Sequence, residues 1–288
     1  MKVLSFGEIL WDVYSDEKYI GGAPFNFAAH MAKHGEKTYM LSAVGNDDLG
    51  KNALEKLNEF GVSAEYVSVL DDKQTGKCLV TLDEQSVPTY NLLQNVAYDF
   101  INVENVPNDF DVLYFGTLSL RDEHNYNALK QLIEKNHFSE IFADVNIRPP
   151  FYSKKSVCFA LENATVLKIS LEEMENVSDL LKIKCQDYKE FAKNISDIFK
   201  NLKYIIVTLG ADGAYTLECA DQKEYSCGGK KVNVKSTVGA GDSFSAAFLH
   251  KYFSGGDICF CMEYAAEVAG YVVSCCEAVP NYKIADFD

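Results

Sequence analysis

The stretch TVGAGDSF at residues 237–244 places Gly239, Ala240 and Gly241 directly before an acid, Asp242. Small residues leave backbone N–H groups unobstructed. At the start of a helix these groups lack intrahelical acceptors and lie at the positive end of the helix dipole, so an anion can bind there. The apolar residues that follow are typical of such a helix. A lone carboxylate beside an anion site can take a proton from an attacking hydroxyl. The stretch therefore suits phosphoryl transfer to an alcohol, with a glycine-rich turn capped by the acid as the alternative.

A second glycine-rich stretch, GGAPFNFA at residues 21–28, lies near the N-terminus. Proline is favoured in the first turn of a helix and glycine just past its end, so a helix is predicted from Pro24 to Gly35. Asn26 then lies in the first turn, where its amide could reach a ligand. A third stretch, GNDDLG, follows at residues 45–50.

The order of these three stretches resembles the ribokinase (PfkB) family of carbohydrate kinases. That family typically has an early double-glycine motif with Asn, then Gly-x-Asp-x-x-Gly, then Gly-Ala-Gly-Asp near the C-terminus. The similarity continues over nearly the whole chain through further motifs in the family's order. Those at residues 97–99 and 144–150 are most similar to fructokinase-like members. These motifs are GE at residues 7–8 with Asp12, AYD at 97–99, DVNIRPP at 144–150 and TLGADG at 208–213.

The resemblance implies that Asp242 is the catalytic base. The backbone N–H groups of the three residues before it would then stabilise the charge that develops on the transferred phosphoryl group. The resemblance also implies that Asp12, Gly22 and Asn26 bind the sugar, since an acid and an amide supply both acceptors and donors for several hydroxyls. Solvated loop residues and a turn are the plainer interpretation of these three.

Arg148 follows a predicted strand end, which is where open α/β sheets bind ligands, and its guanidinium suits phosphate or sugar oxygens. It is therefore expected in the substrate site, and a surface salt bridge is the alternative. By resemblance, ATP is expected along the C-terminal half of the chain. The residues expected near its adenine and ribose are Thr208, Gly210 and Gly213, together with the helix Ile258–Ser274.

The resemblance further implies magnesium, held through water by the acid of an Asn-x-x-Glu motif after a strand. Glu173 aligns with that acid, while Ser170 replaces the Asn, as it often does in fructokinase-like members. Hydrated Mg²⁺ needs few direct protein ligands, so acids acting through water suffice. At Ser236, six residues before the expected base, many members have an Asp that helps to hold a monovalent cation. Serine is a weaker, uncharged ligand, so potassium activation stays open.

Composition limits the classes of partner. The chain has 288 residues, 48% of them hydrophobic and 24% charged, as in an ordinary globular protein. A net charge of −15 argues against a nucleic-acid surface, which needs an excess of basic residues. The nine cysteines are odd in number and form no Cys-x-x-Cys, so free thiols in a reducing cytoplasm are expected. The first residues do not form a secretory apolar region, and no apolar run approaches the roughly 18 residues of a membrane span.

Short apolar runs without strict alternation suit strands that are buried on both faces of a parallel sheet. Helical patterns separate these runs, one ending at Gly61 and another around Ala128 to Ile133. Strand–helix alternation predicts an α/β fold, a three-layer α/β/α sandwich with a mostly parallel central sheet, in one domain over residues 1–288. The runs are Val3–Phe6, Val112–Phe115, Glu140–Ala143, Thr165–Ile169 and Tyr204–Leu209.

Two segments break this pattern and predict a small β-sheet. Residues 12–20 are strand-like, and residues 76–93 read as a hairpin with a turn at Asp83–Ser86. In the family such segments form a lid over the sugar site, and the lid often pairs with a neighbour's lid. Because a hairpin alone is marginal in water and its edges invite pairing, a homodimer through the lid is expected. A monomer whose lid folds onto its own sugar site is the alternative.

These features together predict an ATP-dependent sugar kinase, most like a fructokinase, that phosphorylates a primary hydroxyl of a monosaccharide. A 2-keto-3-deoxygluconate kinase or a nucleoside kinase of the same family remains open. A non-catalytic sugar- or nucleotide-binding regulator is a second alternative, although a regulator has no need of Asp242. A nicotinamide-binding Rossmann protein does not fit, because no Gly-x-Gly-x-x-Gly follows the first strand.

Overall fold

The expected parallel sheet lies at the centre of the molecule. The computed structural model describes residues 1–14, 17–82 and 88–287. In these ranges the main sheet has the order β13-β12-β11-β10-β9-β8-β1-β4-β5, parallel from β11 to β5 and antiparallel at β12 and β13. Its strands are β1 (Lys2–Phe6), β4 (Lys37–Gly45), β5 (Ser63–Leu70), β8 (Val112–Gly116), β9 (Glu140–Asp144), β10 (Val166–Ser170), β11 (Tyr204–Thr208), β12 (Ala214–Glu218) and β13 (Lys223–Cys227).

Strand β1 shows why the apolar runs became central strands. Val3 packs in the cluster that contains α7 and α8, whereas the next residue, Leu4, packs on the opposite face in the cluster that contains α3 and α4. Because both faces are covered, both sets of alternating residues are apolar. The five predicted runs all form strands, and each end lies within one residue of the prediction.

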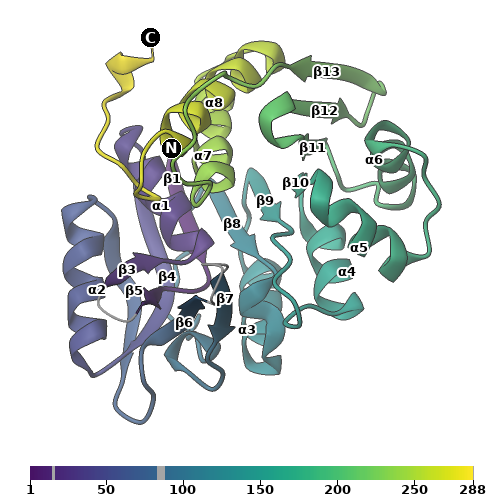
Figure 1. Cartoon of the computed structure of the whole chain (residues 1–288). Helices are drawn as coiled ribbons and strands as arrows, with labels where there is room; N and C mark the ends of the chain where they lie inside the picture. Colours follow the sequence, from purple (N-terminus) through teal and green to yellow (C-terminus); the bar gives the residue numbers. More distant parts are fainter. Residues whose placement is uncertain (15–16, 83–87, 288) are drawn as a thin grey trace.

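Helices cover both faces of this sheet and give the expected three-layer arrangement (Figure 1). One face carries α1 (Ala23–Lys33), α2 (Asp48–Glu59), α7 (Ala240–Phe253) and α8 (Ile258–Val273). The other carries α3 (Glu123–Lys135), α4 (Lys154–Asn163), α5 (Leu171–Leu181) and α6 (Tyr188–Ile198). Short 3-10 turns are η1 (Ala97–Asp99), η2 (Leu118–Arg121), η3 (Gly210–Asp212) and η4 (Ile284–Asp286).

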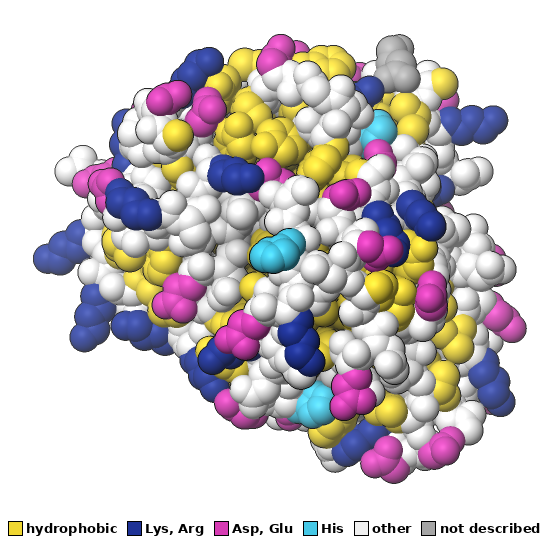
Figure 2. All heavy atoms as spheres, turned by 180° about the vertical axis from the view of Figure 1, so that it is seen from behind, with side chains coloured by type: hydrophobic (Ala, Val, Ile, Leu, Met, Phe, Trp, Pro, Cys, Tyr) yellow, Lys and Arg dark blue, Asp and Glu magenta, His cyan; other side chains and the backbone are white. Residues whose placement is uncertain are grey.

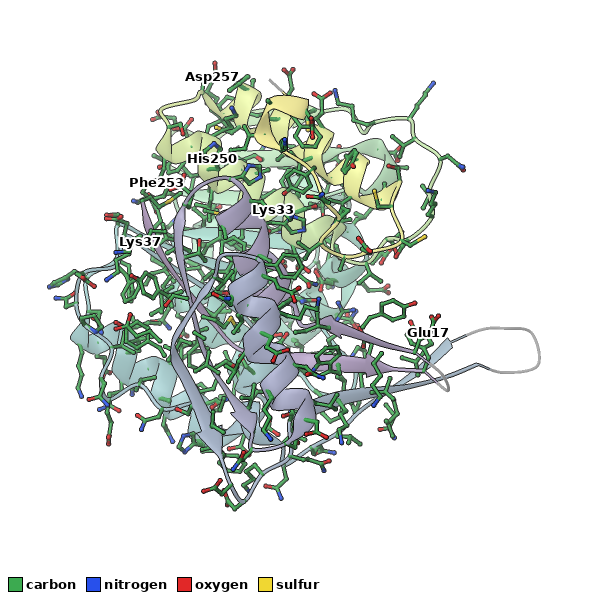
Figure 3. All side chains as sticks on the ribbon, turned by 90° about the vertical axis from the view of Figure 1, so that its left-hand side faces the viewer. Glu17, Lys33, Lys37, His250, Phe253 and Asp257 are labelled. Carbon is green, nitrogen blue, oxygen red and sulfur yellow. The ribbon has the colours of Figure 1, made fainter. Side chains whose placement is uncertain are left out.

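A second, smaller sheet projects from the body of the molecule (Figure 3). We call it the lid; it has the order β3-β2-β6-β7, with β2 parallel to β6 and the other pairs antiparallel. Its strands are β2 (Leu10–Val13), β3 (Lys18–Gly21), β6 (Gly76–Leu82) and β7 (Pro88–Leu92). The predicted turn at Asp83–Ser86 lies outside the described residues. One face of the lid is apolar and packs against Val96 and Tyr98 of the main domain.

The surface and the thiols also bear on the expectations from composition. Figure 2 shows Lys and Arg side chains interspersed with Asp and Glu over the back of the molecule. All nine cysteines lie in described segments, and each is a free thiol. Among residues 1–14, 17–82 and 88–287, none of the helices is both long enough and apolar enough to span a membrane.

Candidate active site

The N-terminus of α7 meets the carboxyl ends of the parallel strands. Helix α7 begins at Ala240, before the apolar residues that predicted a helix after Asp242. Asp242 therefore lies in the first turn of the helix rather than at its cap. The cap residue is Gly239, whose φ of 81° favours glycine. A Cβ at this position would lie 2.4 Å from the carbonyl oxygen of Ala278. In this first turn the N–H of Ala240 donates to the carbonyl oxygen of Thr237 at 3.3 Å, whereas the N–H groups of Gly241 and Asp242 have no backbone acceptor among the described residues, so these two are available to an anion.

Asp242 is a buried acid in contact with the N-terminal part of the chain. Asn26 Nδ2 donates a hydrogen bond of 2.8 Å to Asp242 Oδ2, although the two residues are 216 positions apart. Burial and the nearby Asp144 raise the pKa of Asp242 to about 6, against the lowering effects of Asn26, Lys168 and Arg148. A carboxyl with this pKa is ionised at neutral pH and remains basic enough to accept a proton.

The double-glycine motif supports this contact. Gly22 caps α1 with a φ of 109°, and a Cβ there would lie 2.5 Å from the carbonyl oxygen of Glu8, so only glycine fits. The cap and Pro24 start the helix so that Asn26 falls on its first turn and points at Asp242. Within the described residues, Asn26 Oδ1 is buried without a hydrogen-bond partner, which leaves one acceptor beside the acid.

Asp12 and Arg148 reach the same region from the lid and from the loop after β9. Asp12 lies on β2, and burial raises its pKa, while Cys78 and Arg148 act to lower it. Arg148 is itself exposed, yet its charge acts on Asp12, Glu8 and Asp242. The structure therefore gathers all four expected side chains, Asp12, Asn26, Arg148 and Asp242, around one region.

Glu8 is a buried carboxyl that the sequence reasoning matched to a motif but gave no role. It is 2% exposed, and burial raises its pKa to about 7. The charges that act on it include Arg148, Asp242 and Arg121, so it faces the same region. Among the described residues, Glu8 Oε2 has no hydrogen-bond partner.

Lys168 is a buried cation that the sequence reasoning missed. Its Nζ donates a 2.6 Å hydrogen bond to Asp144 Oδ2, and both side chains are almost fully buried. Burial lowers the pKa of Lys168, but Asp144 and Glu173 outweigh burial and hold the pKa above its usual value. A Cβ at Gly241 would lie 3.1 Å from Nζ, so the ammonium group adjoins the α7 N-terminus. The available signal was a lysine inside an otherwise apolar strand run, Thr165–Ile169.

Glu173, the expected water-mediated metal ligand, is part of the N-terminal cap of α5. It accepts hydrogen bonds from the backbone N–H groups of Ser170, at 2.8 Å, and Ile147, at 2.5 Å. Burial and the nearby Asp144 raise its pKa. In the part of the chain that the structure describes, no group of three His, Cys, Asp or Glu side chains is placed to hold a metal.

The residues expected near ATP form a turn at the same edge of the sheet. Thr208 ends β11, level with Ser170 at the end of β10, and the turn that follows contains Gly210 and Gly213. Their φ angles of 59° and 100° favour glycine, and a Cβ at Gly213 would lie 2.1 Å from the carbonyl oxygen of Cys227. At Ser236, the hydroxyl accepts a 3.2 Å hydrogen bond from the N–H of Val238.

Comparison with known proteins relates the chain to carbohydrate kinases. A family model described as "pfkB family carbohydrate kinase" matches residues 2–283. A 5-dehydro-2-deoxygluconokinase of Geobacillus thermodenitrificans is 26% identical, covering 92% of this chain and 82% of that protein. A nucleoside kinase of Methanocaldococcus jannaschii is 27% identical, covering 90% and 80%. A fructokinase of Vibrio cholerae, solved with fructose, ADP and a potassium ion, has a TM-score of 0.86 at 22% identity, covering 99% and 96% of the two chains; at that identity the likeness shows the fold alone.

Proposed function

This chain belongs to the pfkB family of carbohydrate kinases, and from that premise we propose that it transfers the γ-phosphoryl group of ATP to a primary hydroxyl of a monosaccharide, with Asp242 as the base. The observation that carries the proposal is the hydrogen bond between Asn26 and Asp242 at the N-terminus of α7. It brings the expected sugar-binding segment, the expected base and an anion-binding helix end to one point.

In the proposed reaction, the acceptor hydroxyl lies beside the hydrogen-bonded pair of Asn26 and Asp242, within reach of the Asp242 carboxylate. Asp242 takes its proton as the oxygen attacks the γ-phosphorus, and the bond to the leaving ADP breaks in line with the attack. The backbone N–H groups of Gly239, Ala240 and Gly241 stabilise the negative charge on the phosphoryl oxygens. Asp12, Gly22 and Arg148 hold the remaining sugar hydroxyls, so that the reacting oxygen is oriented before transfer.

The nucleotide is proposed to bind over the turn formed by Thr208, Gly210 and Gly213, with its phosphates directed at α7. Lys168 supports this direction, because its ammonium adjoins Gly241 and stays charged through its pairing with Asp144. A buried cation at this place would counter part of the repulsion between the phosphates and a chain whose net charge is −15.

The donor set suits magnesium that is bound mainly by phosphates and water. Asp144 Oδ1 is buried without a hydrogen-bond partner among the described residues. Glu173 lies close enough to Asp144 for the Asp144 charge to raise the pKa of Glu173. Mg²⁺ commonly keeps several waters and takes one or two carboxylates plus substrate phosphates, so Asp144 and Glu173 would hold it through water. When bound, the ion neutralises charge between the transferred and leaving phosphates.

We propose fructose as the acceptor, on the fructokinase-like motifs at residues 97–99 and 144–150. The named relatives also include kinases of 5-dehydro-2-deoxygluconate and of nucleosides, so those acceptors, and 2-keto-3-deoxygluconate, are the competing candidates. We further propose a homodimer through the lid, and residence in the cytoplasm, where nine free thiols would stay reduced.

The test is ADP release measured over a panel of sugars, sugar acids and nucleosides, for the parent protein and for Asp242→Asn. The asparagine keeps the size of the side chain and can still accept from Asn26, but it cannot take the proton. We expect kcat to fall by about 10²-fold or more, with the binding of ATP and sugar by calorimetry nearly unchanged. Turnover near the parent value would remove Asp242 from the role of base. Highest turnover with a nucleoside or a keto acid would replace fructose as the acceptor.

A further inference from the structure

His30 lies one turn after Asn26 on helix α1, so the two side chains project from the same face of that helix. Asn26 bonds to the proposed base, Asp242, in the first turn of α7. His30 is buried, and its Nε2 lies 3.0 Å from the carbonyl oxygen of Ala278 in the C-terminal segment. One face of α1 therefore contacts the proposed base through Asn26 and the C-terminal segment through His30.

The two hydrogen bonds of the His30 ring define its tautomer. A carbonyl oxygen only accepts, so Nε2 carries the proton and donates to Ala278. Nδ1 then has a free lone pair, and the hydroxyl of Tyr282 donates to it at 2.7 Å. Burial lowers the pKa of His30 to about 4, which keeps the ring neutral at pH 7. With both nitrogens bonded, the ring has one orientation and directs a single donor at Ala278.

The oxygen atom that accepts from His30 also packs against the cap of α7. It is the carbonyl oxygen of Ala278, which would lie 2.4 Å from a Cβ on Gly239. Residues 276–282 form neither helix nor strand, and among the described residues no backbone–backbone hydrogen bond involves them. The place of Ala278 beside Gly239 therefore depends on side chains, and His30 bonds directly to the carbonyl that makes the contact.

We propose that His30 is a positioning residue for phosphoryl transfer, its Nε2–H holding the Ala278 carbonyl against Gly239 so that the first turn of α7 keeps its place beside the transferred group. The inference rests on the proposed function, in which N–H groups at the start of α7 stabilise the charge that develops on that group. A small displacement of such donors weakens the binding of the transition state more than that of the ground state. His30 therefore acts on kcat without touching either substrate.

The test compares His30→Leu, His30→Gln and His30→Asn in steady-state kinetics with the best acceptor from the ADP-release panel, at a temperature where urea unfolding shows each variant to be folded. The amide nitrogen of Gln reaches the position of Nε2, whereas Asn is one methylene shorter and falls short of Ala278. We expect kcat to fall roughly tenfold in His30→Leu and His30→Asn, with both KM values within about twofold of the parent, and His30→Gln to keep kcat within about threefold.

His34→Leu is the matched control, because it removes a second buried histidine at the end of the same helix. The His34 ring stacks on His250 near the opposite end of α7, with 5.0 Å between the ring centres. This variant should lose stability, as His30→Leu does, but keep the kcat of the parent protein.

A second measurement needs no substrate. NMR of the protein labelled with ¹⁵N-histidine distinguishes a protonated from an unprotonated ring nitrogen, and His30→Gln identifies the signals of His30. We expect a protonated Nε2 and an unprotonated Nδ1 from about pH 6 to about pH 8, with the ring neutral throughout. Tyr282→Phe removes the donor to Nδ1, so it should shift the Nδ1 signal and leave the proton on Nε2. An unchanged Nδ1 signal would contradict the assigned tautomer.

The outcomes separate this inference from the proposed function. Turnover near the parent value in Asp242→Asn would overturn the proposed site, and the role of His30 with it. With Asp242→Asn impaired, a parent-like kcat in His30→Leu and His30→Asn would overturn the role of His30 alone. The same conclusion would follow if His30→Gln were as slow as His30→Asn, or if His34→Leu lost as much kcat as His30→Leu. If His30→Leu does not fold, the two amide variants decide. A proton on Nδ1, or a charged ring at pH 7, would show that His30 does not hold Ala278.

Discussion

At the scale of single residues, the proposed base is held in an environment that opposes its charge. Burial and Asp144 disfavour the ionised form of Asp242, while Asn26, Lys168 and Arg148 favour it. The balance leaves the pKa of Asp242 at about 6, between that of an ordinary Asp and neutral pH. Small changes in these neighbours therefore move the pH at which the base becomes active.

The first residue-scale prediction concerns pH. The base must be ionised to act, so kcat/KM should fall about tenfold per pH unit below pH 6 and level off above it. Asn26→Ala removes the donor that favours the ionised form, so it should raise the pKa of Asp242 and move this acid limb to higher pH. Profiles of kcat/KM from pH 5 to 8 for the parent protein and for Asn26→Ala measure this shift. Asn46→Ala, which removes an exposed amide outside this region, is the control. A limb that stays in place, or moves to lower pH, would contradict the assignment.

The second residue-scale prediction concerns the stability of the fold as a function of pH. The folded pKa of Asp242 is raised, so its favourable contribution is complete below pH 4 and is lost as the pH rises through about 6. At pH 7 the buried charge therefore costs folding free energy, and Asp242→Asn should stabilise the protein by about 2 kcal/mol. Urea unfolding at pH 7 and at pH 4 checks this, because the gain should shrink at the lower pH. A variant less stable than the parent at pH 7 would show that Asp242 is not under electrostatic strain.

The sequence predicted part of this site and could not have predicted the rest. Asp242 and the glycines before it were identifiable, because small residues and an acid at a helix start form a local pattern. The contact between Asn26 and Asp242 was not, because it depends on how α1 and α7 pack across 216 residues. Cys78 was visible only as one member of an alternating strand, and its cross-strand neighbour Asp12 became known once the register of β2 and β6 was fixed.

At the scale of elements, the GNDDLG motif joins the main sheet to the lid. Asp47 caps α2 by accepting from Gly50 N at 2.8 Å, and it also accepts from the hydroxyl and the N–H of Thr75 at 2.7 and 2.9 Å. The Thr75 hydroxyl accepts in turn from Gly45 N at the end of β4. One carboxylate therefore ties together the end of a main-sheet strand, the start of a helix and the root of lid strand β6. The sequence motif was matched by family resemblance, and this structural role was not predicted.

The prediction at this scale is that Asp47→Ala loosens the lid as well as the fold. Losing several hydrogen bonds to one carboxylate should lower the free energy of unfolding by about 2–4 kcal/mol. The sugar KM should rise while the ATP KM stays nearly constant, because the lid, and not the turn proposed to bind the nucleotide, is attached here. Urea unfolding and steady-state kinetics measure the two effects. Asp48→Ala, one residue along with a side chain that is 97% exposed, is the control and should change neither. A lower stability with an unchanged sugar KM would separate Asp47 from the lid.

At the scale of the whole molecule, the lid stands out from the body (Figure 3), and among the described residues no further strand pairs with its edge strands β3 and β7. Such edges, and exposed apolar residues such as Leu79 at 36% exposure, favour association with a second copy. The fold and the layer arrangement followed from the pattern of apolar runs. The oligomeric state depends on a surface whose partner the pattern does not specify.

The whole-molecule prediction is a dimer that a charge on the lid dissociates. Light scattering over a concentration series should give twice the sequence mass of 32.2 kDa at micromolar protein. Leu79→Glu should return the mass to that of one chain and raise the sugar KM, since pairing orders the lid. Val69→Glu, which changes an exposed apolar residue on β5 of the main sheet, should leave the dimer intact. A constant mass near 32.2 kDa for the parent protein would refute the dimer.

The distance in sequence between Asn26 and Asp242 has a consequence for synthesis. A ribosome synthesises the chain from its N-terminus, so the proposed sugar-binding segment leaves the ribosome long before the residues that complete the proposed site have been made. The last residue of the site to be made is Ala278. Its carbonyl oxygen packs beside Gly239 and lies 3.0 Å from His30 Nε2. Under the proposed role of Asp242, a nascent chain cannot consume ATP, however well its first half has folded. Activity should therefore begin abruptly after release, when the C-terminal segment packs onto a helix made near the start of translation.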